Sequence, residues 1–206
     1  MSVKEQTVTH VHRDDIGARM GMWLFLFTEL ILFGGMFILY SVYRYKYPEA
    51  FHLAAKELNT IVGTFNTAIL LTSSLTMALS ITAIQRSQKN LSILFQILTI
   101  VLALGFMVNK YFEWSIKFHH GIYPGSDILL AKPSGEIIFF GLYYVMTGLH
   151  GLHVIIGVVL ISVMMRFTSK GIINSGSYVK LESAGLYWHL VDIIWIFLFP
   201  LFYLIT

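Results

Sequence analysis

Five long apolar stretches constrain this chain more than any other feature of its sequence. They cover residues 20–43, 61–84, 91–116, 137–165 and 185–205. An α-helix rises about 1.5 Å per residue, so about 20 apolar residues cross a hydrocarbon core about 30 Å thick. Each stretch is long enough to span a bilayer. We therefore predict an all-α membrane protein, a polytopic bundle with five transmembrane helices.

The composition indicates a chain surrounded by hydrocarbon rather than by water. Only 12% of the 206 residues are charged and 56% are hydrophobic, whereas soluble domains carry about one quarter charged residues. Residues 1–19 lack an apolar run and are predicted to form a solvated N-terminal arm, followed by a single transmembrane domain over residues 20–206. Between the third and fourth stretches, Pro124 and Gly125 indicate an irregular loop over residues 117–136.

The same composition argues against several classes of chemistry. The chain has no cysteine, which excludes disulfides, thiolate metal sites, iron–sulfur clusters and covalently attached c-type haem. Its net charge is only +3, and no run of five like charges occurs. Nucleic acid is therefore not expected as a partner, and membrane topology explains the basic excess better.

The basic residues favour one orientation, because Lys and Arg are retained in cytoplasmic loops. Eight fall on the side of the N-terminus: Lys4, Arg13, Arg19, Arg86, Lys89, Arg166, Lys170 and Lys180. Six fall on the opposite side: Arg44, Lys46, Lys56, Lys110, Lys117 and Lys132. The opposite side also carries more of the acidic residues, so the N-terminus is predicted to lie inside, on the cytoplasmic side of the membrane.

Glu29 is the first ionisable residue placed at membrane depth. It lies ten residues into the first stretch, in LFLFTELILFGG, and a carboxyl group in hydrocarbon is costly unless it is neutral, hydrogen-bonded or paired. One interpretation is a proton-relay or proton-uptake group, and the other is a buried hydrogen bond to a neighbouring helix. The residue alone leaves both open. Gly34 and Gly35, further along, predict close contact with another helix.

Two pairs of polar residues also fall at membrane depth, with a spacing of three that places both members of a pair on one helix face. They are His150 and His153 in TGLHGLHVIIG, and His189 and Asp192 in YWHLVDIIW. The favoured interpretation is an interhelical polar network in which His189 and Asp192 meet His150 or His153. Asn66, in the second stretch, is expected to hydrogen-bond to another helix.

A metal or haem site is the alternative interpretation of these histidines. Di-metal sites in helical bundles use more carboxylates than these stretches offer. Two histidines three apart on one helix cannot bind opposite faces of one haem. No metal is therefore expected in this chain.

Several motifs, in order along nearly the whole chain, resemble subunit III of the haem-copper respiratory oxidases in its short bacterial form. They are GMWLFLFTELILFGGMF around Glu29, NTAILLTSS from Asn66, YFEW around Glu113, GLYYVMTGLHGLHVIIG around His150, and YWHLVDIIWIFLF around His189. The TGxHGxHVxxG and YWHxVDxxW patterns, with the glutamate helix upstream, are the most specific.

The resemblance implies an accessory subunit of a proton-pumping terminal oxidase of aerobic respiration, with no catalytic centre of its own. Haem and copper would belong to the partner subunits I and II, and a small subunit IV is a further partner. The chain would pack directly on subunit I and support proton uptake and stability of the catalytic centre. Glu29 matches the intramembrane glutamate of the family, and the matches to its buried polar positions are His150, His153, His189, Asp192 and Glu113.

The chain departs from the seven-helix form of the family, because it begins at the helix that carries Glu29. Seven-helix members hold phospholipids between their first two helices and the other five, so a bound phospholipid and the source of the two missing helices stay open here. The resemblance implies the bacterial plasma (inner) membrane, with the N-terminus inside and membrane lipids around the bundle.

Alternative functions remain at this point. A cytochrome c oxidase is favoured over a quinol oxidase, and an accessory subunit of a nitric oxide reductase is a related alternative. From other classes, the chain could be an independent b-haem electron carrier that uses His189 with His150 or His153. A proton-coupled transporter built around Glu29 is a further alternative, although no internal repeat supports it.

Overall fold

The computed structural model describes residues 15–204, and five of its helices are long and apolar enough to cross a membrane. These are α1 (Asp15–Lys46), α3 (Thr60–Gln85), α4 (Lys89–His119), α6 (Ser134–Ser169) and α7 (Val179–Tyr203), and the two short helices are α2 (Pro48–Lys56) and α5 (Asp127–Leu130). No β-strand occurs among the described residues. The prediction of an all-α bundle with five apolar helices is confirmed.

The helices extend beyond the apolar stretches that predict them. Helix α1 begins at Asp15, so residues 15–19, expected in the solvated arm, are helical, whereas the rest of that arm, residues 1–14, lies outside the described residues. Helix α5 lies within the loop predicted over residues 117–136. Hydropathy marks the part of a helix that crosses hydrocarbon, and it misses helical turns that continue into the polar interface.

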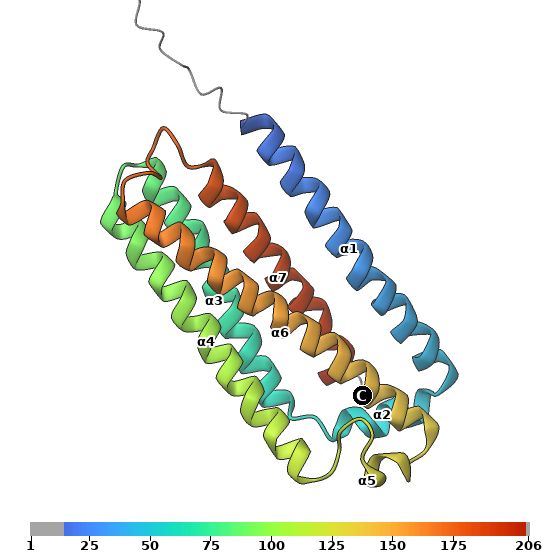
Figure 1. The fold of residues 1–206 in the computed structure, drawn as a ribbon. Helices are drawn as coiled ribbons and strands as arrows, with labels where there is room; N and C mark the ends of the chain where they lie inside the picture. The colour runs from blue at the N-terminus through green and yellow to red at the C-terminus, as the bar shows by residue number, and fades with distance from the viewer. Residues whose placement is uncertain (1–14, 205–206) are drawn as a thin grey trace, which may run out of the picture.

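Four of the long helices, α3, α4, α6 and α7, form a bundle, and α1 lies along its side (Figure 1). Helix α7 is the most enclosed of them, because it contacts α3, α6 and α1. Helix α1 contacts only α6 and α7 among the long helices, and most of its surface is exposed.

Buried positions recur in steps of four and three residues along α4. They are Ser92, Gln96, Thr99, Ala103, Phe106, Lys110, Glu113 and Lys117. This seven-residue repeat is typical of helices that pack side by side at small crossing angles. Because most of these residues are polar, α4 directs its hydrophilic face into the bundle and its apolar face outward, the reverse of a helix on the surface of a soluble protein.

Helix α1 is held against the bundle by a narrower seam with the same repeat. Its buried residues are Leu26, Phe33 and Tyr40, each seven after the one before. Glu29 lies on this seam, which directs it toward α6 and α7. By contrast, a Cβ atom built at Gly34 or Gly35 would have no atom of another described helix within 4 Å. The close helix contact predicted from these two glycines is therefore not made within the described chain.

The end of the bundle opposite the start of α1 is closed by α2 and α5 (Figure 1). Lys132, just after α5, lies 2.5 Å from a carboxylate oxygen of Glu57 and 3.0 Å from one of Glu136. Burial lowers the pKa of Lys132, but hydrogen bonds to these two carboxylates outweigh burial and raise it above its ordinary value. The lysine therefore stays charged and ties the end of α2 to the start of α6.

Candidate functional site

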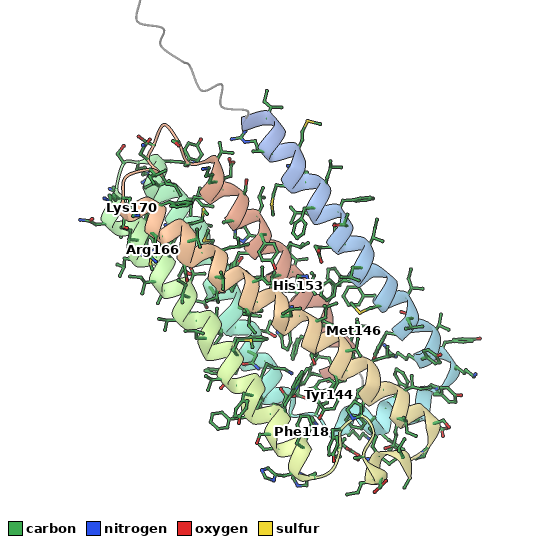
Figure 2. All side chains as sticks on the ribbon, viewed as in Figure 1. Phe118, Tyr144, Met146, His153, Arg166 and Lys170 are labelled. Atoms are coloured by element: carbon green, nitrogen blue, oxygen red, sulfur yellow. The ribbon has the colours of Figure 1, made fainter. Side chains whose placement is uncertain are left out.

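Glu29 and His153 form a pair in the middle of the membrane-spanning part of the molecule. The Oε2 atom of Glu29, on α1, lies 2.9 Å from Nε2 of His153, on α6. Both side chains are mostly buried, with 14% and 10% exposed. Figure 2 shows His153 about midway along α6. The partner that the sequence could not identify for Glu29 is therefore a histidine of the TGLHGLHVIIG motif.

The other ring nitrogen of His153 determines how protons are arranged in this pair. His153 Nδ1 lies 2.7 Å from the carbonyl oxygen of Leu149, and because a carbonyl only accepts, Nδ1 must carry a hydrogen. Nε2 and an ionised Glu29 would both be acceptors, so their contact requires one further proton. Either Glu29 holds it as a carboxylic acid or His153 holds it as an imidazolium. In both forms the pair is neutral overall and shares one proton.

His153 is fixed in place by neighbours on two other helices. The edge of its ring contacts Phe33 of α1, with ring centroids 5.4 Å apart. Its carbonyl oxygen accepts a hydrogen bond of 3.1 Å from the Tyr187 hydroxyl on α7. The pair is thus positioned where α1, α6 and α7 meet.

His150 does not join this pair, although it is one turn away on α6. It is fully buried, and neither ring nitrogen has a hydrogen-bond partner among residues 15–204. Its ring packs against Phe106 of α4 at 5.6 Å and Trp195 of α7 at 5.2 Å. In this structure His150 is part of an aromatic cluster.

The predicted hydrogen bonds between Asp192 or His189 and the histidines of α6 are not formed, so that part of the prediction is wrong. His189 Nδ1 lies 2.7 Å from the Ser74 hydroxyl, on α3. Asp192 is buried next to Ser74, but neither carboxyl oxygen meets hydrogen-bond geometry with a described residue. The spacing of three correctly placed both residues near one face of α7, and that face is turned toward α3.

A second buried cluster surrounds Glu113 and links α4, α6 and α7. Lys110 Nζ lies 3.1 Å from Glu113 Oε2, and it donates hydrogen bonds of 3.0 Å to the hydroxyls of Tyr143 and Tyr203. Those hydroxyls donate in turn to Glu113 Oε1, at 2.7 and 2.6 Å. Only 8% of the Lys110 side chain and 6% of that of Glu113 are exposed, so the charges satisfy one another inside the bundle.

Sequence reasoning missed three members of this cluster, and for one of them a signal was available. The topology count places Lys110, near the end of the third stretch, with the basic residues of the outer side, yet it precedes Glu113 by three residues, a spacing that pairs charges on a helix. It also continues the repeat of polar residues that begins at Ser92. Tyr143 and Tyr203 lie in apolar stretches where nothing distinguishes them from residues anchored at the membrane interface.

Helices α3 and α4 are joined by small polar side chains. The pairs are Asn66 with Asn109 at 3.0 Å, Thr76 with Thr99 at 2.7 Å, and Ser80 with Ser92 at 3.1 Å. Asn66 thus makes the interhelical hydrogen bond expected from its position. Polar contacts of this kind hold helices together in lipid, where apolar surfaces give little drive to association.

Within residues 15–204 the arrangement offers no centre at which three or more ligating side chains converge. Among the described residues, no group of three His, Asp or Glu side chains lies close enough to hold a metal ion. A bis-histidine haem would need His189 and one histidine of α6 to face a common space. Instead His189 pairs with Ser74, and His153 pairs with Glu29.

Comparison with known proteins agrees with the resemblance given above. A profile of the family Cytochrome c oxidase subunit III matches residues 2–206. Cytochrome c oxidase subunit 3 of Thermostichus vulcanus is 31% identical over 97% of this chain and 92% of its own length. A probable quinol oxidase subunit 3 of Staphylococcus saprophyticus is 26% identical, over 91% of this chain and 88% of its own length.

A third relative joins two subunits in one polypeptide. The heme-copper oxidase subunit I+III of Aeropyrum pernix is 28% identical over 91% of this chain, which covers 22% of that longer protein. The match over residues 2–206, together with the five apolar helices and the intramembrane glutamate and histidines, leads to one conclusion. The chain belongs to the cytochrome c oxidase subunit III family of the haem-copper oxidases.

Proposed function

We propose that this chain is the non-redox accessory subunit of a proton-pumping oxidase, that it packs on subunit I, and that it supports proton uptake and the stability of the catalytic centre. The observation that carries the proposal is the pair of Glu29 and His153, which shares one proton at membrane depth. Haem and copper would reside in the partner subunits.

Direct packing on subunit I is supported by the relative from Aeropyrum pernix, whose printed name joins subunits I and III in one chain. Subunit II and a small subunit IV are proposed as further members of the complex. Cytochrome c is proposed as the electron donor and quinol as the alternative, because relatives of both kinds match.

Replacing Glu29 by Gln is expected to leave the complex assembled and to slow proton uptake severalfold at high pH. A glutamine amide can donate to His153 Nε2, so the contact between α1 and α6 is kept, but it cannot release a proton. The effect should be largest at high pH, where free protons are scarce and uptake depends on groups that already hold one. Proton uptake by the purified oxidase in single-turnover experiments is the measurement.

The matched control for this variant is Glu182→Gln, which removes a carboxylate from the exposed ion pair with Arg19. It should leave proton uptake unchanged. If Glu29→Gln instead releases the subunit from the complex, the carboxyl group is a structural anchor. Unchanged uptake by an intact Glu29→Gln complex would contradict the proposed role in proton uptake.

The alternatives predict different partners or spectra. A nitric oxide reductase accessory subunit would co-purify with that enzyme. An independent b-haem carrier would show a Soret band that disappears in His189→Ala, and a proton-coupled transporter would carry a substrate in liposomes that contain this chain alone. The ring contacts that enclose His150, described above, favour the accessory subunit over the carrier.

The N-terminus is proposed to lie on the cytoplasmic side of a bacterial plasma membrane. The structure supports this assignment, since Lys110 and Lys117 are buried on α4 rather than in an outer loop. The basic residues that remain on that side are Arg44, Lys46, Lys56 and Lys132, against eight on the other.

The absence of native cysteine gives a direct test of this orientation. Ser175→Cys, in the exposed connection between α6 and α7, is expected to react with a membrane-impermeant maleimide only from the cytoplasmic side. His119→Cys, at the exposed end of α4, should react only from outside. The reverse pattern in intact cells and inverted vesicles would overturn the assignment.

A bound phospholipid is also proposed. Between α1, α6 and α7 lies an apolar groove of about 590 Å³, whose lining includes Met22, Phe25, Ile156 and Leu160. Lys180 also lines this groove. An acyl chain fits such a surface, and the ammonium group would attract the phosphate of the head group.

A further inference from the structure

Helix α7 is enclosed on most sides, but one stripe of it reaches the surface of the bundle. Leu186 and His189 are partly exposed, and Ile193 and Ile196 are 46% and 42% exposed. These residues follow one another in steps of three and four, so they lie on one face of the helix. The neighbouring face of α3 is exposed at Leu71 and Leu75.

His189 makes this surface unusual for a face in contact with lipid. Its Nδ1 is paired with the Ser74 hydroxyl at 2.7 Å, and Nε2 forms no hydrogen bond with any residue between 15 and 204. An imidazole nitrogen at membrane depth needs a partner, because hydrocarbon supplies neither donors nor acceptors. A second helix that packs on this stripe could provide one.

The outward faces of α4 and α6 differ from this surface. In the middle of the membrane the most exposed residues of α4 are Val101, Leu104 and Val108, and those of α6 are Val145, Leu152 and Val159. All of them are apolar, which suits contact with acyl chains. The face around His189 carries polar groups, whereas the outward faces of α4 and α6 do not. This difference indicates that the face around His189 contacts protein rather than lipid.

We infer that the stripe of α7 around His189, together with the adjoining face of α3, is the surface on which a transmembrane helix of subunit I packs, and that this helix offers a hydrogen-bonding group to His189. The inference rests on the proposed function, which supplies subunit I as the partner. It adds the surface and the polar contact at its centre. Small polar side chains such as Ser74 are typical of such helix–helix interfaces in lipid.

Photo-crosslinking in the intact complex tests the surface. A photoreactive amino acid at Ile193 is expected to form an adduct with subunit I, whereas the same residue at Leu104, on the outward face of α4, should yield lipid adducts only. An adduct from Ile193 with lipid alone, or with a second copy of this chain, would overturn the inference. Ile193→Trp should also lower the amount of this chain retained by tagged subunit I, and Leu104→Trp should not.

Three variants test the polar contact. His189→Leu is expected to weaken retention by tagged subunit I severalfold, and His189→Gln should restore part of it because an amide can still hydrogen-bond. Ser74→Ala, which removes only the contact within the chain, should have the smallest effect. If His189→Leu and Ser74→Ala lower retention by tagged subunit I equally, the proposed contact between His189 and subunit I is wrong.

The wild-type chain separates the inference from the function on which it rests. If wild-type chain is absent from complexes purified through subunit I, the proposed function fails and the inference with it. If wild-type chain is present but Ile193 forms no adduct with subunit I, only the surface is wrong.

Discussion

Replacing Glu113 by leucine is expected to lower the free energy of unfolding by about 3–5 kcal/mol, the usual cost of leaving one member of a buried ion pair without its partner. Lys110 Nζ would lose its carboxylate inside the bundle, and two tyrosine hydroxyls would lose their acceptor. Lys110→Met should cost a similar amount, because it leaves the carboxylate uncompensated. Unfolding by SDS in mixed micelles, followed by tryptophan fluorescence, measures the change.

The double variant Lys110→Met with Glu113→Leu is the informative comparison. Removing both charges exchanges an ion pair for apolar contacts, which is often close to neutral. The hydroxyls of Tyr143 and Tyr203, 3.4 Å apart, can then bond to each other. We therefore expect the double variant to be more stable than either single variant, which gives a strongly favourable coupling energy.

An exposed ion pair provides the control for this double-mutant cycle of Lys110 and Glu113. Arg19 and Glu182 lie 2.8 Å apart with 50% and 35% of their side chains exposed, and such pairs contribute at most about 1 kcal/mol. Glu182→Leu should therefore have little effect on unfolding. Wild-type stability in Glu113→Leu would show that the cluster does not stabilise the bundle. A loss in the double variant equal to the sum of the two single losses would show that Lys110 and Glu113 are not coupled.

The number of long apolar helices and their approximate positions could be predicted because the length of an apolar run has one simple physical meaning in a bilayer. Rotation of each helix about its axis was harder to predict. In α4 the apolar residues face outward and the polar seam from Ser92 to Lys117 faces inward. The count of basic residues therefore places Lys110 with the charges of the outer side, although its spacing from Glu113 and from Thr99 predicts a place on the buried seam.

The candidate site shows the same limit. Glu29 and His153 were each identified as polar residues at membrane depth, but a sequence spacing states only which residues share a face of their own helix. It does not state which neighbouring helix that face meets. The partner of Glu29 depends on how α1 rests on α6, and the partner of His189 depends on α7 facing α3 at Ser74. Both contacts join segments more than 100 residues apart.

Gly157→Ala is expected to destabilise the protein, although alanine normally favours a helix over glycine by about 1 kcal/mol. A Cβ atom at this position of α6 would lie 2.6 Å from the Trp188 ring of α7. That ring is fully buried and its Nε1 donates to Ser73 on α3 at 3.1 Å, so it cannot move away without losing that bond. Overpacking of this kind typically costs about 1–3 kcal/mol, and SDS unfolding measures it.

Gly141, on the same helix, is the matched control for Gly157, because a Cβ atom there would have no neighbour within 4 Å. Gly141→Ala should be neutral or slightly stabilising, so the two substitutions are expected to change stability in opposite directions. Adding Trp188→Phe to Gly157→Ala should recover part of the loss, since the smaller ring makes room for the methyl group. If Gly157→Ala behaves like Gly141→Ala, then α6 and α7 are not packed as closely as the contact between Gly157 and Trp188 requires.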